Sequence, residues 1–238
     1  MQKILQLSLT DFRQILREQL LWVMFIVAPT AQFALARWLM PVAIDYFPVL
    51  NEYRYLLAGA MTLQVVAGIG FVVAMMLLDE KDEDVLTAIR VLPLGPEGFL
   101  TYRLLAATGI AVIFGFSMLY FSGLVNITFT KALAAAMLFA MMSPVVVLFM
   151  STYGDNKVEG LAMYKGINIV LLLPIVSFFV PAGWKYFFGI IPDFWSFQFI
   201  GPATNVFSLS WLNFLIGLLL HVLLIGYLFV QFKRKVFQ

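Results

Sequence analysis

The sequence has 238 residues, of which 63% are hydrophobic and 12% are charged, and its formal net charge is +2. Soluble domains average roughly 45–50% apolar and about 25% charged residues, so a globule could not hide this much apolar surface from water. The small net charge gives no indication of a nucleic-acid partner, and the lack of cysteine excludes disulfides and thiolate metal sites. We therefore expect an all-α polytopic membrane protein that contacts membrane lipid.

Residues 1–19 have the pattern of a helix that lies in the headgroup region of a bilayer. Apolar residues recur at helical spacing from Leu5 to Leu16, and a basic polar face that includes Arg13 and Arg17 lies opposite them. We expect a cytoplasmic interfacial helix here, with a plain cytoplasmic extension as the alternative. No cleavable signal peptide is expected, because the charged segment before the first apolar run is too long for one.

Six apolar runs follow, and most approach the roughly 20 residues that a transmembrane helix needs. They are Leu20–Met40, Tyr55–Leu78, Leu104–Val125, Ala132–Met150, Gly166–Val180 and Trp211–Val230. The fifth run is short and contains Pro174, which a membrane helix tolerates when neighbouring helices satisfy the freed carbonyl. Residues 20–238 are therefore expected to form one six-span transmembrane domain.

The segment 181–210, between the fifth and sixth runs, is aromatic and broken by proline. Trp184, Tyr186 and Trp195 fall on either side of Pro192. Tryptophan and tyrosine favour the boundary between headgroups and hydrocarbon, so we expect an outer re-entrant helical element here. The alternative is a seventh span, which would place the C-terminus outside.

Lysine and arginine residues favour an orientation with both termini in the cytoplasm. With six spans arranged in this way, eleven of the fifteen basic residues fall on the inner side and four on the outer side. The inner set is Lys3, Arg13, Arg17, Lys81, Arg90, Arg103, Lys157, Lys165, Lys233, Arg234 and Lys235, and the outer set is Arg37, Arg54, Lys131 and Lys185. Cytoplasmic loops carry the excess of positive charge, so the count predicts the N-in, C-in topology.

The inner loop 79–99, between the second and third spans, carries most of the information about function. Its acidic start suits a helix N-terminus, apolar residues recur from Val85 to Leu92 at helical spacing, and Pro93 ends the pattern. We therefore expect a small amphipathic helix that projects from the membrane and docks on a cytoplasmic partner. A solvated charged loop without a partner is the alternative.

This loop resembles the corresponding loop of ABC exporter permeases of the ABC type-2 family. The matching residues are Glu80-Lys81, Leu86, Ile89, Pro93-Leu94 and Arg103, whereas Asp84-Val85 and Gly95 depart from the Gly-Thr and Ser of the family pattern. The inner loop Asp155–Lys165 and the sequence Pro192-Asp193-Phe194-Trp195 are similar to members that export drugs or quinolones. The resemblance covers nearly the whole chain.

The resemblance implies a permease subunit that moves an amphipathic, drug-like or lipid-like cargo across the cell membrane. The sequence contains no G-x-x-x-x-G-K-[ST] phosphate loop, so the ATPase, with its ATP and Mg²⁺, is expected on a separate chain and no cofactor on this one. A second permease chain, identical or paralogous, would complete the unit. The residues expected to couple this chain to the ATPase are Glu80, Asp82, Glu83, Val85, Leu86, Ile89 and Pro93.

Four residues are expected to line a cargo path, because methionine and phenylalanine adapt to varied apolar shapes: Gln64, Met141, Phe178 and Phe179. Ordinary helix packing is the alternative for each of them. His221, the single histidine, lies midway in the last span and is expected to form an interhelical hydrogen bond. None of the six runs offers it a carboxylate, so no proton relay is expected.

Two other functions remain open from the sequence. The acidic stretch 79–84 resembles the boxes that hold magnesium pyrophosphate in membrane prenyltransferases, which would make the chain a membrane-embedded enzyme or an enzyme anchor. Such enzymes need a second carboxylate box, and the sequence shows none. A structural subunit of a membrane complex, docked through the acidic loop, is the other alternative.

Overall fold

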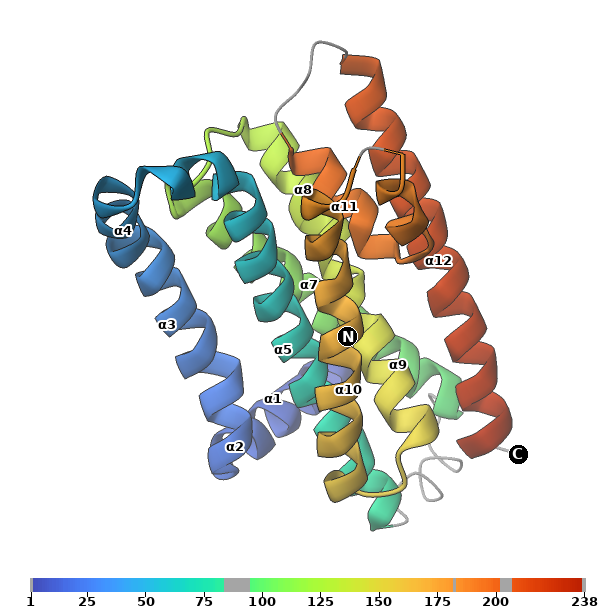
Figure 1. Cartoon of the computed structure of the whole chain (residues 1–238). Helices are drawn as coiled ribbons and strands as arrows, with labels where there is room; N and C mark the ends of the chain where they lie inside the picture. Colours follow the sequence, from blue (N-terminus) through green and yellow to red (C-terminus); the bar gives the residue numbers. More distant parts are fainter. Residues whose placement is uncertain (1, 84–94, 182, 202–206, 237–238) are drawn as a thin grey trace.

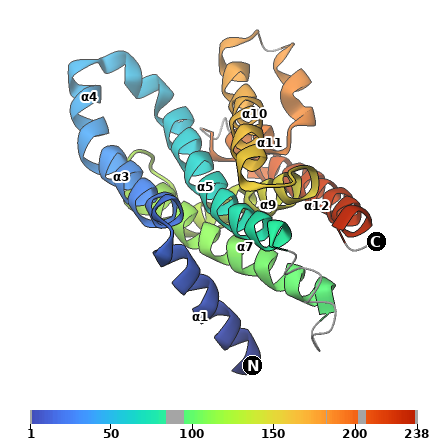
Figure 2. The ribbon, with the colours of Figure 1, turned by 90° about the horizontal axis from the view of Figure 1, so that it is seen from below.

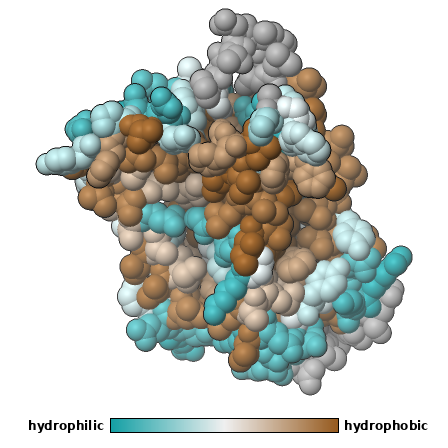
Figure 3. Space-filling model, viewed as in Figure 1, coloured by the Kyte–Doolittle hydropathy of each residue, from teal (hydrophilic) through white to brown (hydrophobic). Residues whose placement is uncertain are grey.

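The computed structural model describes residues 2–83, 95–181, 183–201 and 207–236, and these residues form helices and turns without a strand. Six helical segments are long and apolar enough to cross a membrane. They comprise Gln19–Tyr46, Pro48–Asp82, Glu97–Phe121, Phe129–Tyr153, Lys157–Phe179 and Trp211–Val236. The predicted six-span, all-α architecture is confirmed. On the face that Figure 3 shows, hydrophobic residues cover most of the middle of the molecule, and hydrophilic residues gather mainly toward its two ends.

The N-terminal helix α1 (Gln2–Arg17) runs across the direction of the spans and projects from the bundle (Figure 2). Within its described side chains, Phe12 and Leu16 are exposed apolar residues, whereas Ile15 packs into the core. Arg13 and Arg17 are exposed as well. This arrangement agrees with a helix that lies along a bilayer surface. The helix lies at the same end of the bundle as the C-terminal end of α12, and we call this the inner end, following the predicted orientation (Figure 1).

The first span consists of α2 (Gln19–Trp22), α3 (Ala28–Ala34) and α4 (Met40–Tyr46), joined by two widened π-helical turns, η1 (Val23–Val27) and η2 (Leu35–Leu39). Each widened turn ends two residues before a proline, Pro29 or Pro41. Proline has no N–H and its ring crowds the carbonyl four residues back, so the preceding turn opens to i→i+5 bonding. These two prolines explain the irregular course of this span.

The second span, α5 (Arg54–Asp82), follows the short turn η3 (Pro48–Tyr53) and forms the centre of the bundle. Most of its central side chains are buried, because α7 (Gly95–Phe121), α9 (Met142–Tyr153) and α10 (Lys157–Val176) pack around it (Figures 1 and 2). A helix that is hydrophobic on all sides is expected at such a central position.

The fourth span is bent at Met141, between α8 (Phe129–Ala140) and α9. Pro144 cannot donate a hydrogen bond to the carbonyl of Ala140, so the helical ladder is interrupted at this point. The two halves have different neighbours: α8 packs mainly against α7 and α11, whereas α9 packs mainly against α5 and α12.

The segment between the fifth and sixth spans contains η5 (Ser177–Phe179), η6 (Lys185–Ile190) and α11 (Pro192–Ile200). Nine residues of α-helix extend only about 14 Å, and a bilayer core is about 30 Å thick, so α11 cannot cross it. Most of α11 is buried against α12 (Phe207–Val236), α8 and α5 in the upper half of Figure 1. The described part of this segment therefore adds no seventh span, and its placement as a re-entrant element stays a prediction.

The observed spans are longer at their inner ends than the apolar runs predicted. The fifth span begins at Lys157 rather than Gly166, because Asn156 caps α10 by accepting a hydrogen bond from the N–H of Glu159 at 3.0 Å. The amphipathic helix expected over Val85–Leu92 lies outside the described residues.

Candidate coupling site at the inner ends of the spans

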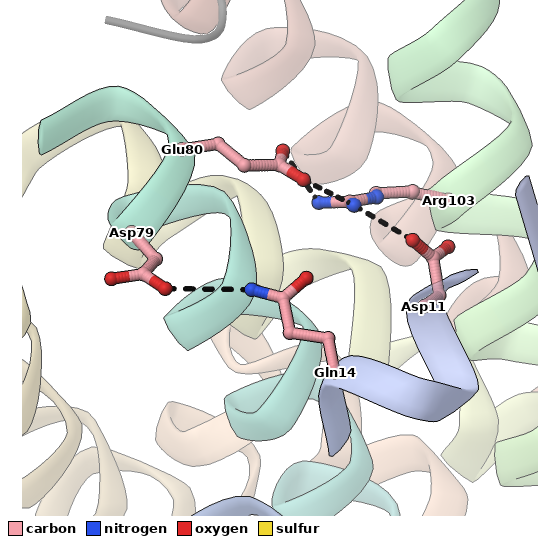
Figure 4. Close-up of polar contacts among 5 residues, drawn as sticks. All are labelled: Asp11, Gln14, Asp79, Glu80 and Arg103. Atoms are coloured by element: carbon pink, nitrogen blue, oxygen red, sulfur yellow. Dashed lines mark hydrogen bonds and ion pairs between the residues drawn. The ribbon is translucent and has the colours of Figure 1, made fainter. Parts of the chain in front are cut away.

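Arg103 of α7 lies at the centre of a buried ion cluster at the inner end (Figure 4). Its Nη1 and Nη2 atoms donate to the two carboxylate oxygens of Glu80 on α5, at 2.7 and 2.5 Å. Nη2 also donates to Oδ1 of Asp11 on α1 at 2.9 Å, and the guanidinium lies over the ring of Phe99. A planar guanidinium matches a carboxylate in this bidentate geometry, so charge-assisted hydrogen bonds join three helices here.

A second cluster beside it joins α5 to α10. Nζ of Lys157 lies 2.8 Å from Oδ1 of Asp79 and donates to both carboxylate oxygens of Glu18 at 3.0 Å. Gln14 of α1 donates from Nε2 to the other oxygen of Asp79 at 3.4 Å (Figure 4). The start of α10 is thus held against both the second span and the residue that links α1 to the first span.

The turn before α10 is held by Lys81, which donates from Nζ to the carbonyl oxygen of Gly154 and to Oδ1 of Asp155, both at 2.8 Å. The hydrogen bond and positive charge of Lys81 lower the pKa of the exposed Asp155 carboxyl. Glu159 accepts a hydrogen bond from the N–H of Asp155 at 3.0 Å, which completes a capping arrangement with Asn156. Local sequence therefore fixes this turn, and Lys81 attaches it to α5.

The last span joins the same end through weaker contacts. Nζ of Lys233 on α12 forms an ion pair with Glu97 of α7, and Lys235 lies over the ring of Tyr153 on α9. Both members of the Lys233–Glu97 pair are exposed, so solvent screens their attraction. The inner ends of five spans and of α1 are connected through side chains.

The described residues on either side of 84–94 lie close to these clusters in the sequence. Helix α5 ends at Asp82 on one side, and α7 begins at Gly95 on the other, where a φ of +64° suits glycine. Arg103 and Glu80 join these two helices to each other. A force applied to the segment 84–94 would therefore act on α1, α5 and α7 together.

The predicted coupling residues fall into three groups. Glu80 is largely buried against Arg103, whereas Asp82 and Glu83 are exposed at the end of α5. Val85, Leu86, Ile89 and Pro93 lie outside the described residues. Contact of any of them with an ATPase stays a prediction. Reasoning from the sequence did not anticipate Asp11, Glu18 and Lys157, which complete the clusters from distant parts of the chain.

The residues predicted to line a cargo path are spread over the bundle. Gln64 is half-buried in α5, and Met141 lies at the bend of the fourth span. Phe178 packs edge-on against Phe197, and Phe179 stacks on Tyr53 with 5.6 Å between ring centroids. Their role in a path stays a prediction.

An open apolar groove of about 560 Å³ lies between α9, α10 and α12, closed at one end by Ile190–Pro192. Its lining includes Met142, Phe149, Tyr153 and Gly166. The volume falls within the range of about 300–1,000 Å³ that is typical of small-molecule sites. None of the four predicted path residues lines this groove.

The first two residues of the acidic stretch considered as a magnesium box form ion pairs within the protein. Asp79 and Glu80 are paired with Lys157 and Arg103, so their oxygens are directed into intramolecular ion pairs. Across residues 2–83, 95–181, 183–201 and 207–236, no group of three or more metal-ligand side chains is present.

His221 has a buried carboxylate neighbour that the six apolar runs do not contain. Asp193 of α11 places Oδ1 3.7 Å from Nε2 of His221, and both side chains are fully buried. The expectation considered only the six apolar runs, whereas this carboxylate comes from α11, between the fifth and the sixth. The hydrogen bond that the structure gives His221 lies within α12, between Nδ1 and the carbonyl oxygen of Gly217 at 2.8 Å, so the predicted interhelical hydrogen bond is not formed within the described part of the chain. Asp193 is an interhelical neighbour beyond hydrogen-bond distance of Nε2.

Comparison with known proteins identifies relatives over nearly the whole chain. Residues 11–229 match the family model described as "Fluoroquinolones export permease protein Rv2686c-like". The chain is 26% identical over 234 residues to the fluoroquinolones export permease protein Rv2686c of Mycobacterium tuberculosis strain ATCC 25618 / H37Rv, covering 94% of this chain and 92% of the relative. It is equally similar to the fluoroquinolones export permease protein MT2760 of strain CDC 1551 / Oshkosh.

Proposed function

The chain belongs to the Rv2686c-like family of export permeases, and from this premise we propose that it is the membrane subunit of an ATP-binding-cassette exporter in the cell membrane. As a multi-pass membrane protein of this family, it is a permease rather than a catalytic enzyme. The proposal adds a separate ATPase chain that carries ATP and Mg²⁺, and a second permease chain, identical or paralogous, in the working unit.

The observation that carries the proposal is the buried cluster of Arg103 with Glu80 and Asp11. A solvated loop needs no such attachment, because exposed charges on a free loop contribute little to stability. Here the two helices that flank the segment 84–94 are joined to each other and to the interfacial helix α1. This arrangement suits a segment that receives a mechanical input from a cytoplasmic partner.

The mechanism follows from this attachment. When ATP closes the ATPase, the segment 79–99 moves with it, and the cluster transfers that movement to α1, α5 and α7. The spans then tilt and change access from the inner to the outer side. Coupling of this kind requires that the segment make different contacts with the ATPase in the two states.

The groove between α9, α10 and α12 supports an amphipathic cargo. Met142 and Phe149 offer adaptable apolar surface, while Tyr153 adds a polar group near its inner end. The relatives are named for export of fluoroquinolones, and these drugs combine an aromatic ring system with charged ends. We propose a cargo of this chemical class.

The decisive experiment is purification of the tagged chain from native membranes, followed by identification of the chains that remain bound. The expected result is a P-loop ATPase whose ATP hydrolysis rises when a fluoroquinolone is added to the complex in proteoliposomes. ATP-dependent accumulation of the drug in inside-out vesicles would complete the test. A complex without any ATPase, or drug movement unaffected by ATP, would contradict the proposal.

A further inference from the structure

The buried contact between Asp193 and His221 lies beside a close approach of α11 to α12. Gly217, one turn before His221, lies so near Trp195 that an added Cβ would be 2.9 Å from the Cβ of that tryptophan. The absence of a side chain at Gly217 therefore brings the two backbones together and places Asp193 opposite His221. Both side chains have no exposed surface, and 3.7 Å separates Oδ1 of Asp193 from Nε2 of His221.

The surroundings of His221 fix which ring nitrogen carries hydrogen. Its Nδ1 lies 2.8 Å from the carbonyl oxygen of Gly217, and a carbonyl oxygen can only accept. Nδ1 therefore donates, and the neutral imidazole directs the lone pair of Nε2 toward Asp193. If Asp193 were also ionised, a carboxylate would face a lone pair at a fully buried position.

That fully deprotonated arrangement is unfavourable, since a buried carboxylate needs a donor to compensate its charge. Both carboxylate oxygens of Asp193, Nε2 of His221 and Oγ of the nearby Ser196 have no hydrogen-bond partner among the described residues. One additional proton removes the conflict. It can reside on Asp193, which then donates toward Nε2, or on Nε2, which then forms an ion pair.

We propose that Asp193 and His221 form a proton-binding site that holds helix α11 against the last span. The site binds one proton, shared between carboxylate and imidazole. Loss of that proton leaves an uncompensated buried carboxylate and weakens the contact between α11 and α12. The proposal goes beyond the exporter function and does not depend on it.

Other ionisable groups on the neighbouring elements are engaged elsewhere or lie toward helix ends. Lys131 of α8 donates to the carbonyl oxygen of Gly201, and Lys185 of η6 lies over the ring of Tyr186. The remaining groups on α5, α9, α10 and α12 are Arg54, Asp79, Glu80, Lys81, Asp82, Tyr55, Tyr153, Lys157, Glu159, Tyr164, Lys165, Tyr227, Lys233, Arg234 and Lys235. In the described structure, the ionisable side chain paired with Asp193 is His221.

The test uses the fact that His221 is the single histidine of the chain. Protein labelled with ¹⁵N-histidine and reconstituted in lipid nanodiscs gives ring-nitrogen NMR signals from this residue alone. At neutral pH, the wild type should show Nε2 either protonated or hydrogen-bonded. As the pH is raised, the chemical shift of Nε2 should change in a single step, when the shared proton is lost. Asp193→Asn should keep a hydrogen bond to Nε2 and lose that change, whereas Asp193→Leu should show a free lone pair.

Thermal stability provides a second readout that needs no labelled signal. At a pH well above about 6.5, the ordinary pKa of histidine, an unfolded chain has released the protons of both side chains, whereas we expect the folded chain to retain one on the pair. Because the folded state then binds more protons, the stability of the wild type should fall as pH rises. Asp193→Asn should remove this part of the decline, and Asp45→Asn, at an exposed site of the first span, should leave it unchanged.

Two results would overturn the proposal. One is a wild-type Nε2 signal with a free lone pair at neutral pH that does not change up to alkaline pH. The other is an alkaline loss of stability that is equal in the wild type and in Asp193→Asn. Because the wild-type titration alone decides the first point, the test does not depend on any variant folding.

Discussion

Gly70 of α5 lies directly against the backbone of Ser143 in α9. A methyl group on the α-carbon of Gly70 would lie 2.6 Å from the carbonyl oxygen of Ser143 and 3.0 Å from its α-carbon. Neither atom can move away without displacing the helix, because both belong to the main chain. The central span and the inner half of the fourth span are therefore packed so closely at this point that no side chain fits on Gly70 without a shift.

Gly70→Ala should lower the stability of the protein by about 1–3 kcal/mol, because overpacking forces α5 and α9 apart. Gly68→Ala is the matched control on the same helix, since an added Cβ there meets no atom within 4 Å. The control should be neutral or gain up to about 1 kcal/mol from the better helix propensity of alanine. Thermal unfolding in detergent, followed by tryptophan fluorescence, measures both. Equal melting temperatures would show that the close approach is not maintained in the membrane protein.

Glu80→Leu should destabilise the protein by about 3–5 kcal/mol, because it leaves the buried Arg103 guanidinium with Asp11 as its remaining carboxylate partner. The double variant Glu80→Leu/Arg103→Leu should recover part of this loss, since the buried guanidinium is then absent and only the partly exposed Asp11 loses its partner. Glu97→Leu removes the exposed pair with Lys233 and should change stability by about 1 kcal/mol or less. Chemical denaturation in mixed micelles ranks the three variants, and a loss at Glu97 as large as that at Glu80 would contradict the assignment.

Charge reversal by Asp82→Lys/Glu83→Lys should reduce cargo-stimulated ATP hydrolysis about fivefold or more, the lower range of a measurable coupling. Both side chains are exposed, so insertion and stability should be retained. The control is Asp45→Lys/Glu52→Lys, which reverses two exposed charges at the other end of the bundle. Hydrolysis by the copurified ATPase, with and without cargo, is the measurement. Unchanged coupling in the first variant would remove this end of α5 from the ATPase contact.

The stabilisation from the contact of Lys81 with Asp155 should be lost in acid. Because the pKa of Asp155 is lowered in the folded protein, its contribution to stability is present above the ordinary carboxyl value of 3.8 and is lost as pH falls through the lowered pKa. The difference in stability between the wild type and Asp155→Asn should therefore be constant near neutral pH and disappear in strong acid. Melting temperatures measured over this range test it, and a difference that grows in acid would have the wrong sign.

Gly166→Trp should block cargo binding, because Gly166 lines the groove and an added Cβ there meets no atom within 4 Å. The indole can then occupy the groove without disturbing helix packing. Gly226→Trp is the control, since Gly226 also has free space around it but does not line the groove. Fluorescence titration with a fluoroquinolone should show at least about a tenfold loss of affinity for the first variant, or about 1.4 kcal/mol, and little change for the second.

The sequence was sufficient for the six spans because hydropathy is a local property. The hydropathy of a run such as Trp211–Val230 is enough to predict a span, and the helical spacing of apolar residues is enough to predict the amphipathic helix α1. The widened turns before Pro29 and Pro41 could also have been expected, because proline always removes a helical hydrogen bond.

The ion clusters could not be derived in the same way, because they depend on tertiary packing. Arg103 and Asp11 are 92 residues apart, and Lys157 and Glu18 are 139 apart, so no sequence period relates them. The neighbour of His221 could have been anticipated from a weaker signal in the sequence. A histidine within a span requires a polar neighbour, and Asp193 is the single carboxylate between the fifth and sixth spans.

The bend at Met141 gives the fourth span a property that a straight rod lacks. Its two halves are each only 12 residues long and pack mainly against different neighbours, so a change of the angle between them would preserve the main contacts of each half. A displacement of one half of the fourth span would then be accommodated by rotation about Met141, rather than by sliding of the whole span along its neighbours. Bending at Met141 meets less resistance than elsewhere in the span, because Pro144 donates no backbone hydrogen bond across this position.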